Sequence, residues 1–321
     1  MSPSGTDQRR VAVLTHTGKP AAVSAATQLV AGLSRAGITS LLPADDLTEL
    51  RSALAGHHVG RLGPAIEHSD CELVIVLGGD GTILRGAEWA LAADIPLLGV
   101  NLGHIGFLAE AESTELDQIV PHVVQRTYPV EQRSTIVMEV CDADGTVLWD
   151  SFAVNEVSIE KAARERMLEV LVEVDGRPLS RWGCDGVLVS TPTGSTAYAF
   201  SAGGPVIWPD VDALLLVPLS AHALFARPLV LGPRSTVRVE LLQSYTEGKG
   251  VVWCDGRRSV PVKPGQRVSM HEGPHRLLLA RLSQAPFTDR LVGRFGLRVE
   301  GWRGANASQD TALEDSGADE S

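Results

Sequence analysis

The feature that most constrains the fold is an uninterrupted apolar run, Leu73-Val-Ile-Val-Leu77, which leads directly into Gly78-Gly79-Asp80-Gly81-Thr82. A strand without polar alternation is buried on both faces, as in a parallel sheet covered by helices. The residues from Thr82 to Ala93 then follow a helical pattern. The glycine loop is therefore predicted to join the carboxyl end of a central strand to a helix, which is where α/β sheets bind ligands.

Strand and helix patterns alternate through the rest of the first half of the chain. Apolar runs at Val11–Thr15, Ile38–Leu42 and Pro96–Val100 indicate strands, and apolar positions from Ala21 to Ala36 recur at helical spacing before Gly37. This order predicts an α/β domain with a parallel sheet over residues 10–132.

From about Ser134 the pattern changes to a two-residue alternation, which is typical of strands with one buried face. The alternating segments are Ile136–Val140, Leu168–Val174, Val187–Ser190, Val237–Leu241 and Leu277–Leu282. Asp144-Gly145, Asp175-Gly176 and Asp255-Gly256 lie between such segments and predict hairpin turns, because glycine tolerates positive φ. Residues 133–284 are therefore predicted to form a mostly antiparallel all-β domain.

Composition limits the class of protein. Hydrophobic residues make up 44% and charged residues 21% of the 321 residues, which is typical of folded domains. The net charge of −11, from 28 basic and 39 acidic side chains, argues against a nucleic-acid partner. Residues 1–9 and 304–321 are predicted to be disordered tails. The four cysteines form no C-x-x-C pair, and neither a signal peptide nor a membrane span is recognisable, so we expect a cytoplasmic protein without a membrane partner.

The glycine loop is the segment best suited to bind a phosphate. Glycines allow close approach of backbone N–H groups, and a helix N-terminus adds partial positive charge. Asp80 is the one acid in this loop and is interpreted as a general base, with an N-cap or Asx-turn role as the alternative. Thr82 is more typical of a helix cap, and Arg85 either reaches the same phosphates or is merely solvated.

Three weaker segments carry polar groups suited to a nucleotide. Asn101-Leu-Gly-His-Ile-Gly-Phe107 follows another predicted strand, and Asn155-Glu156 supplies an amide and a carboxylate for ribose hydroxyls. Thr191 to Ser201 holds five serine and threonine side chains and two aromatic residues, Tyr198 and Phe200, within eleven positions. That density suits a sugar and an amide-bearing ring, although a serine- and threonine-rich turn would have the same composition.

Taken together and in this order, these segments resemble the NAD kinase family. The motifs are Gly-Gly-Asp-Gly-Thr at 78–82, Asn-x-Gly-x-x-Gly-Phe at 101–107, Asn155-Glu156 and Thr-Pro-Thr-Gly-Ser-Thr-Ala-Tyr at 191–198. Ala221 to Leu229 and Asp255-Gly256 are also similar, and the likeness extends from about Val11 to Arg303. Phosphofructokinases and lipid kinases share the glycine loop alone.

The resemblance implies a phosphofructokinase-like N-terminal α/β domain, an all-β C-terminal sandwich domain and an active-site crevice between them. It also implies a homo-oligomer, a dimer or tetramer, and a C-terminal segment 285–303 that packs back on residues 1–130. The implied reaction is phosphorylation of the 2′-hydroxyl of the adenosine ribose of NAD to give NADP. ATP, another NTP or inorganic polyphosphate would be the donor, and Mg²⁺ or another divalent metal ion would be held by the nucleotide phosphates. Asp80 would be the proton acceptor.

The resemblance also assigns substrate and nucleotide contacts to particular positions of this chain. These positions are Gly78, Gly79, Gly81, Thr82, Arg85, Asn101, His104, Phe107, Asn155, Glu156, Arg166, Asp185, Thr193, Thr196, Ala197, Tyr198, Ala199, Phe200 and Ser201. Asp185 matches an aspartate that contacts NAD across a subunit or domain interface, and Thr196–Ser201 match the lining of the nicotinamide and ribose pocket. Gly183 and Arg257 depart from some relatives.

Three other functions are compatible with parts of the sequence. An NAD-dependent dehydrogenase would fit the α/β half, but the chain has no G-x-G-x-x-G motif. A lipid or sugar kinase would share the glycine loop without requiring the segment from Thr191 to Ser201. A non-catalytic NAD sensor is disfavoured by the retention of Asp80 in an intact loop.

Overall fold

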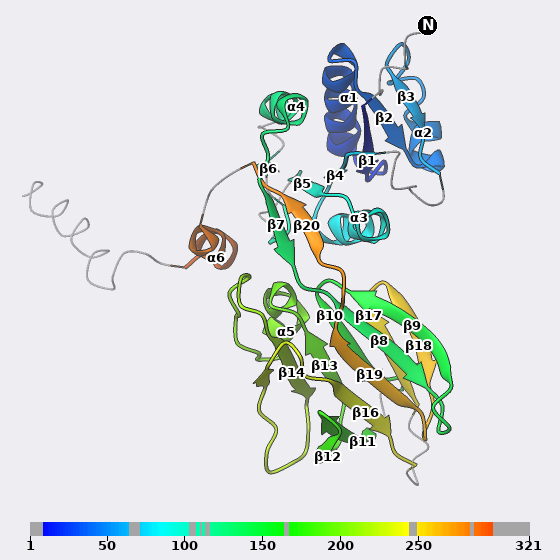
Figure 1. Ribbon diagram of the computed structural model, residues 1–321, viewed down its shortest axis with the longest axis vertical. Coiled ribbons are helices and arrows are strands. Elements are labelled where there is room, and N and C mark those ends of the chain that lie inside the picture. The colour runs from blue at the N-terminus through cyan, green and yellow to red at the C-terminus, as the bar shows by residue number, and fades with distance from the viewer. Residues whose placement is uncertain are drawn as a thin grey trace, which may run out of the picture. The chain divides into compact units, whose positions relative to one another are not determined.

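The computed structural model describes residues 9–63, 71–102, 107–109, 111–112, 116–163, 167–243, 249–282 and 286–297 (Figure 1). The chain up to residue 283 forms one compact unit. The C-terminal segment is a second unit, in which the described residues contain one helix, α6 (Phe287–Phe295).

The first part of the chain folds around a sheet with the order β3-β2-β1-β4-β5-β20-β7, with β6 paired to β5. All neighbouring strands are parallel except β20 and β7, which are antiparallel. The strands are β1 (Arg10–Thr15), β2 (Thr39–Leu42), β3 (Val59–Arg61), β4 (Leu73–Leu77), β5 (Leu97–Asn101), β6 (Ala111–Glu112), β7 (Val130–Arg133) and β20 (Leu277–Ala280). The predicted parallel sheet is confirmed.

Helices cover both faces of this sheet, as the apolar run at Leu73–Leu77 predicted. The helices are α1 (Pro20–Arg35), α2 (Ala44–Glu49), α3 (Asp80–Ala93) and α4 (Leu116–Gln125). Alternate residues of β4 enter two different cores: Leu73, Ile75 and Leu77 pack with α1 and α4, whereas Val74 and Val76 pack with α3. Because both faces are buried, polar alternation along this strand would place polar groups in a core.

The strand order fixes where a ligand can bind. β2 and β3 lie on one side of β1, and β4 and β5 lie on the other, so the order in which strands are added along the sheet reverses between β1 and β4. Thr15 at the end of β1 pairs with Leu77 at the end of β4. The loops that follow these two strands therefore begin side by side, at the position where open α/β sheets form a ligand crevice.

The second part of the chain forms two antiparallel six-stranded sheets. One has the order β15-β14-β13-β10-β17-β18, and the other β12-β11-β16-β19-β8-β9. The strands of the first are β10 (Glu156–Lys161), β13 (Gly186–Ser190), β14 (Leu214–Leu219), β15 (Leu229–Leu231), β17 (Gly250–Cys254) and β18 (Arg258–Val262). Those of the second are β8 (Ile136–Cys141), β9 (Val147–Ala153), β11 (Leu168–Val174), β12 (Arg177–Cys184), β16 (Val237–Leu241) and β19 (Arg267–Glu272).

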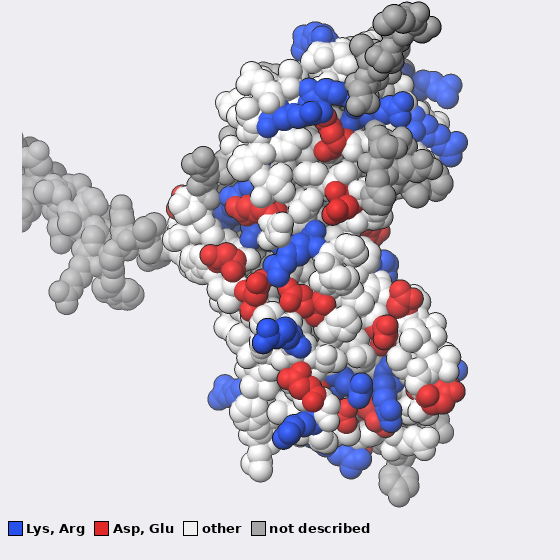
Figure 2. Space-filling model, viewed as in Figure 1, with Lys and Arg blue, Asp and Glu red and all other residues white. Residues whose placement is uncertain are grey.

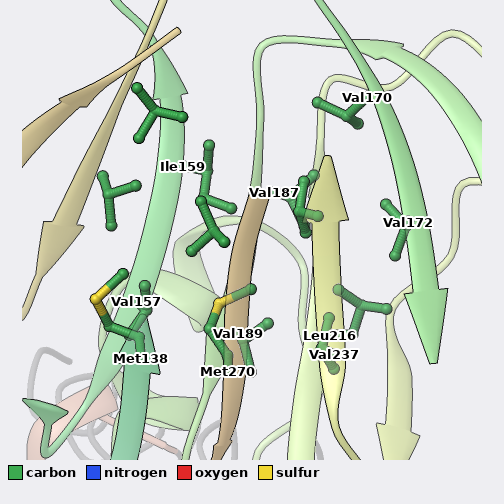
Figure 3. Close-up of a cluster of buried hydrophobic side chains, with 14 of the residues drawn as sticks. Met138, Val157, Ile159, Val170, Val172, Val187, Val189, Leu216, Val237 and Met270 are labelled. Atoms are coloured by element: carbon green, nitrogen blue, oxygen red, sulfur yellow. The ribbon is translucent and has the colours of Figure 1, made fainter. Parts of the chain in front are cut away.

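A single hydrophobic core joins these two sheets and makes them a sandwich. Val157 and Val187 from one sheet and Met138, Val170 and Met270 from the other belong to this core and lie close together in Figure 3. The predicted hairpin turns connect neighbouring strands. Asp175-Gly176 and Asp255-Gly256 have positive φ at both positions, between 53° and 72°, as a tight hairpin turn requires. The expected all-β sandwich is confirmed.

One predicted strand belongs to the other sheet. Leu277–Leu282 was expected in the all-β domain, but β20 pairs with β5 and β7 in the first sheet. Two-residue alternation indicates a strand with one buried face, but it does not indicate which sheet the strand joins. The chain thus returns to the first sheet at Leu277. The predicted packing of residues 285–303 stays a prediction, and residues 298–303 lie outside the described part.

The predicted N-terminal tail is too long by one residue. Arg9 was included in a tail over residues 1–9, but its guanidinium donates hydrogen bonds to Glu72 at 3.0 Å and to the carbonyl groups of Val123 and Val124 at 2.6 and 2.7 Å. These two carbonyls lie in the last turn of α4, where a cation is favourable. The other residues of both predicted tails lie outside the described ranges.

Two surface properties relate to the expected partners. On the face drawn in Figure 2, Lys and Arg side chains are interspersed with Asp and Glu side chains. Among the described residues, no helix is both long and apolar enough to cross a lipid bilayer.

Helix α3 depends on a glycine for its packing against the sheet. A Cβ atom on Gly86 would overlap Cγ2 of the buried Val76 and lie 3.2 Å from Cδ1 of Leu97. We expect Gly86→Ala to lower the free energy of unfolding by about 1–3 kcal/mol because of this overpacking. Intrinsic helix propensity alone would change it by about 1 kcal/mol in the opposite direction. Urea unfolding measures which effect is larger.

Gly81→Ala is the matched control for this prediction, because the same change in the same helix points into open space. If both variants were equally stabilised, close packing at Gly86 would be excluded as the reason for the glycine.

Candidate functional site

The glycine loop is a tight junction between β4 and α3. The N–H of Gly78 donates to the carbonyl of Val100 at 2.9 Å, and the N–H groups of Thr82 and Ile83 donate to the carbonyl of Gly79 at 2.8 and 3.1 Å. A Cβ atom on Gly79 or Gly81 would meet no other atom of the described residues within 4 Å. The first turn of this 14-residue helix therefore opens onto free space, an arrangement suited to an anion.

Asp80 is the first residue of α3 and is half-buried. The N-cap position belongs to Gly79, so capping does not explain why a carboxylate stands at 80. Its Oδ1 accepts a long hydrogen bond, 3.4 Å, from the N–H of Leu108, which follows the neighbouring strand β5. Asp80 is thus the acid that lies at the junction of the two loops that the sequence singled out.

Arg85 is held at the end of β1. Its guanidinium donates to the carbonyl of Thr15 at 3.0 Å and lies 3.8 Å from the buried carboxylate of Asp46, which also accepts the N–H of Thr15 at 3.3 Å. Burial raises the pKa of Asp46, while the Thr15 N–H and Arg85 act in the opposite direction. Sequence reasoning found Arg85 but missed Asp46, because an acid in a short helix carries no signal of its own.

Asp255 organises the turn that contains Asn155 and Glu156. Its carboxylate is 2% exposed and accepts three successive backbone N–H groups, from Val154 at 3.0 Å, Asn155 at 2.7 Å and Glu156 at 3.3 Å. Burial raises the pKa of Asp255, and these hydrogen bonds together with Arg258 lower it. The sequence identified Asp255-Gly256 only as a turn, because the N–H groups it binds are about 100 residues away.

Glu156 is a buried acid, and one of its two carboxylate oxygens lacks a hydrogen-bond partner among the described residues. The residue is 8% exposed, and among the described residues Oε2 has no hydrogen-bond partner. Burial, with a smaller contribution from the nearby charge of Asp255, raises the pKa of Glu156 to about 8, although the N–H of Tyr198 acts in the opposite direction. A buried acid at the start of β10 with one unsatisfied oxygen is a group that a bound hydroxyl or base edge would satisfy.

The threonine- and serine-rich segment is partly structural. Thr191 Oγ1 donates to the carbonyl of Val154 at 2.6 Å, and Ser195 Oγ donates to that of Pro192 at 2.6 Å; both residues are fully buried. For these two residues the alternative of a serine- and threonine-rich turn holds, because the neighbouring backbone satisfies their hydroxyls. The segment forms η2 (Thr193–Thr196) and α5 (Tyr198–Ser201).

A cavity of about 640 Å³ lies beside α5. Three residues of the predicted set, Asp185, Tyr198 and Ser201, contribute to its lining. Lys161 also lines it, and its Nζ forms an ion pair with Asp185 Oδ1 at 2.5 Å. Burial raises the pKa of Tyr198, with smaller contributions from the acids Glu160, Glu156 and Asp185. The structure thus brings together residues that are widely separated in the sequence.

Other predicted residues are placed differently. Ala199 is fully buried in a small core with Leu188 and Leu215, so the structure places it in the packing beneath α5 and not on an open surface. Phe200 is 42% exposed, and Asn101 is buried at the end of β5. Further half-buried positions are Thr82, Phe107, Thr193, Thr196 and Ala197. His104 and Arg166 lie outside the described residues.

Family comparisons cover both halves of the chain. Residues 11–128 match the ATP-NAD kinase N-terminal domain, and residues 154–282 match the ATP-NAD kinase C-terminal domain. The chain is 53% identical over 297 residues to NAD kinase 2 of Streptomyces coelicolor, which covers 92% of this chain and 97% of that protein. It is 51% identical over 295 residues to the NAD kinase of Cutibacterium acnes, with 92% of each chain covered.

Two solved structures share the fold at low sequence identity. Yeast NADH kinase complexed with NADH superimposes with a TM-score of 0.80 and 22% identity over 94% of each chain. The NAD kinase of Archaeoglobus fulgidus in complex with ATP gives a TM-score of 0.65 and 23% identity, covering 89% of this chain and 97% of that one. From the two matching domain models and the closely similar relatives, the chain belongs to the NAD kinase family.

Proposed function

We propose that this protein transfers the terminal phosphoryl group of ATP to the 2′-hydroxyl of the adenosine ribose of NAD, which yields NADP and ADP. Family membership supports the reaction class. The observation that carries the assignment of the site is the open N-terminus of α3, where Asp80 stands beside two glycines whose Cβ positions are vacant.

Asp80 is proposed as the general base. The 2′-hydroxyl oxygen attacks the terminal phosphorus, its proton passes to a carboxylate oxygen of Asp80, and the bond to the ADP oxygen breaks. A carboxylate among phosphates is otherwise unfavourable, and capping does not account for it because Gly79 is the N-cap. A positioned base contributes on the order of 10²–10⁴ in rate.

The donor phosphates are proposed to bind at the first turn of α3. A Cβ atom on Gly79 or Gly81 would meet no described atom within 4 Å, and Arg85, 40% exposed, is held at the adjacent end of β1 by Thr15 and Asp46. The Asp80 carboxylate is the group of the loop that would face a divalent ion carried by the nucleotide, held mainly by phosphates and water. When bound, this ion would neutralise charge on the transferred phosphoryl group.

The acceptor is proposed to lie between the Asn155-Glu156 turn and the cavity beside α5. Asn155 and the free Oε2 of Glu156, which has no hydrogen-bond partner among the described residues, would hold nucleotide hydroxyls or base edges, and Asp185, Tyr198 and Ser201 would line the nicotinamide and ribose pocket. The rest of the predicted binding set keeps the roles that the family resemblance gives it. Phosphoryl transfer leaves little covalent work to the protein, so these contacts act by positioning.

The finer points of the proposal concern donor range, assembly and location. Polyphosphate or another NTP would present the same terminal phosphate to the glycine loop, so we include them as donors. Exposed apolar side chains at Trp208, Leu224 and Phe225 are compatible with a homo-oligomer, a dimer or tetramer, which we propose from the family resemblance. We also propose that the enzyme acts in the cytoplasm.

Asp80→Asn tests the base. We expect the variant to fold normally and to lose turnover by at least about 10²-fold, because the amide cannot accept the hydroxyl proton. NADP formation from NAD, ATP and Mg²⁺ is read through an NADP-specific dehydrogenase. Asp94→Asn, the same change at the left-handed C-cap of α3, is the matched control and should keep wild-type turnover. Near-normal turnover of Asp80→Asn would show that Asp80 is not the general base.

Gly81→Ala separates phosphate binding from folding. The new methyl group meets no atom of the described part of the chain within 4 Å, so stability should be unchanged or slightly higher. If donor phosphates approach this turn, the methyl group blocks them, and we expect the KM for ATP to rise at least about tenfold while the KM for NAD changes little. Unchanged kinetics in a stable variant would place the donor elsewhere.

Glu156→Gln tests the buried acid through the pH dependence of stability. The pKa of Glu156 is raised from 4.5 to about 8 in the folded protein, so between these values the folded state binds more protons than the unfolded state. Its contribution to stability is therefore full below pH 4.5 and declines as the pH rises toward 8. We expect Glu156→Gln, which cannot ionise, to gain stability relative to wild type from pH 5 to pH 8 in urea unfolding. A constant difference across this range would contradict the raised pKa.

A further inference from the structure

An acid on the helix that begins with Asp80 contacts the β17–β18 turn of the sandwich. Glu88 lies eight residues after Asp80 in α3; its Oε1 accepts a hydrogen bond from Nε of Arg257 at 3.2 Å and forms an ion pair, without hydrogen-bond geometry, with Nε of Arg258 at 3.3 Å. All three side chains are between 24% and 34% exposed. These ion pairs cross from the α/β part of the chain to the sandwich.

Arg258 makes further contacts that Arg257 lacks among the described interactions. Its guanidinium forms an ion pair with Asp255 Oδ2 at 3.2 Å, donates to Ser151 Oγ at 3.0 Å, and lies 4.1 Å from the ring centre of Phe152. A guanidinium held on its flat face and on several nitrogen atoms has little freedom to move. Arg258 is therefore the cation that joins Glu88 to Asp255, whereas Arg257 donates the hydrogen bond to Glu88 and has no contact with Asp255 among the described interactions.

The connection continues to the nucleotide side of the site. Asp255 accepts the N–H groups of Val154, Asn155 and Glu156, so it fixes the backbone of the turn proposed to hold the acceptor. A continuous series of contacts thus runs from α3 through Glu88, Arg258 and Asp255 to Asn155-Glu156. One end carries the proposed base, and the other carries proposed acceptor contacts.

We propose that Glu88 and Arg258 are positioning residues that set the separation between the Asp80 end of α3 and the Asn155-Glu156 turn. This inference rests on the proposed function. In-line phosphoryl transfer requires reacting atoms about 3–3.5 Å apart, and a displacement of 1 Å can reduce the rate about 10²-fold. The ion pairs of Glu88 with Arg257 and Arg258 are partly exposed and screened by water, so they contribute little to the free energy of unfolding. We expect their effect on the geometry of the site to be larger.

The prediction concerns turnover in Glu88→Gln, Arg258→Met and the double variant. We expect each single change to lower kcat at least about tenfold and to leave the KM for ATP within about twofold, because the glycine loop is untouched. The double variant should be no slower than the slower single variant, since both changes break the same connection. Arg257→Met is the matched control, which removes one partner of Glu88 without touching Asp255 and should keep kcat within about twofold.

Arg258→Met leaves the buried Asp255 carboxylate without its cation and can impair folding. Glu88→Gln preserves the Arg258–Asp255 pair and keeps the test valid in that case. Wild-type kcat in Glu88→Gln, multiplicative losses in the double variant, or an equal loss in Arg257→Met would each overturn the inference. Absence of NADP formation by the wild-type protein would instead contradict the proposed function, so the two failures are distinguishable.

Discussion

The candidate site depends on one buried carboxylate. Asp255 accepts three consecutive backbone N–H groups from Val154 to Glu156, and each of these groups would cost about 1–3 kcal/mol if it were buried without a partner. Because the carboxylate is in turn paired with Arg258, part of the cost of its burial is offset. The backbone of the Asn155-Glu156 turn is thus held by a residue about 100 positions away.

The same carboxylate affects the chemistry of its neighbour. Burial is the main reason why the pKa of Glu156 rises to about 8, and the negative charge of Asp255 adds to it. Two acids in one buried region do not both ionise readily, because each charge disfavours the other. Asp255 therefore stabilises the turn, but it also disfavours the ionised form of Glu156, whose Oε2 has no hydrogen-bond partner among the described residues. Such an imbalance is typical of binding sites.

The packing of the sheet positions the other half of the site. β4 is buried on both faces, so α3 and α1 lie on opposite sides of it and the loops after β1 and β4 begin side by side. Gly86 allows α3 to approach β4 closely, while Gly79 and Gly81 leave the first turn of α3 open. Glycine thus serves two different purposes in one segment, close packing in the helix and access at its start.

The sequence by itself determined the elements and the motifs. An unbroken apolar strand, helical spacing and two-residue alternation predicted the parallel sheet and the sandwich, because these patterns report local periodicity and burial. The glycine loop and the order of the motifs predicted the family. Only the tertiary structure assigned Leu277–Ala280 to the first sheet, attached Asp46 to Arg85 and connected Glu88 to Arg258. Those relations join residues far apart in the chain, and neither propensity nor spacing encodes which distant partner a strand or a charged side chain will meet.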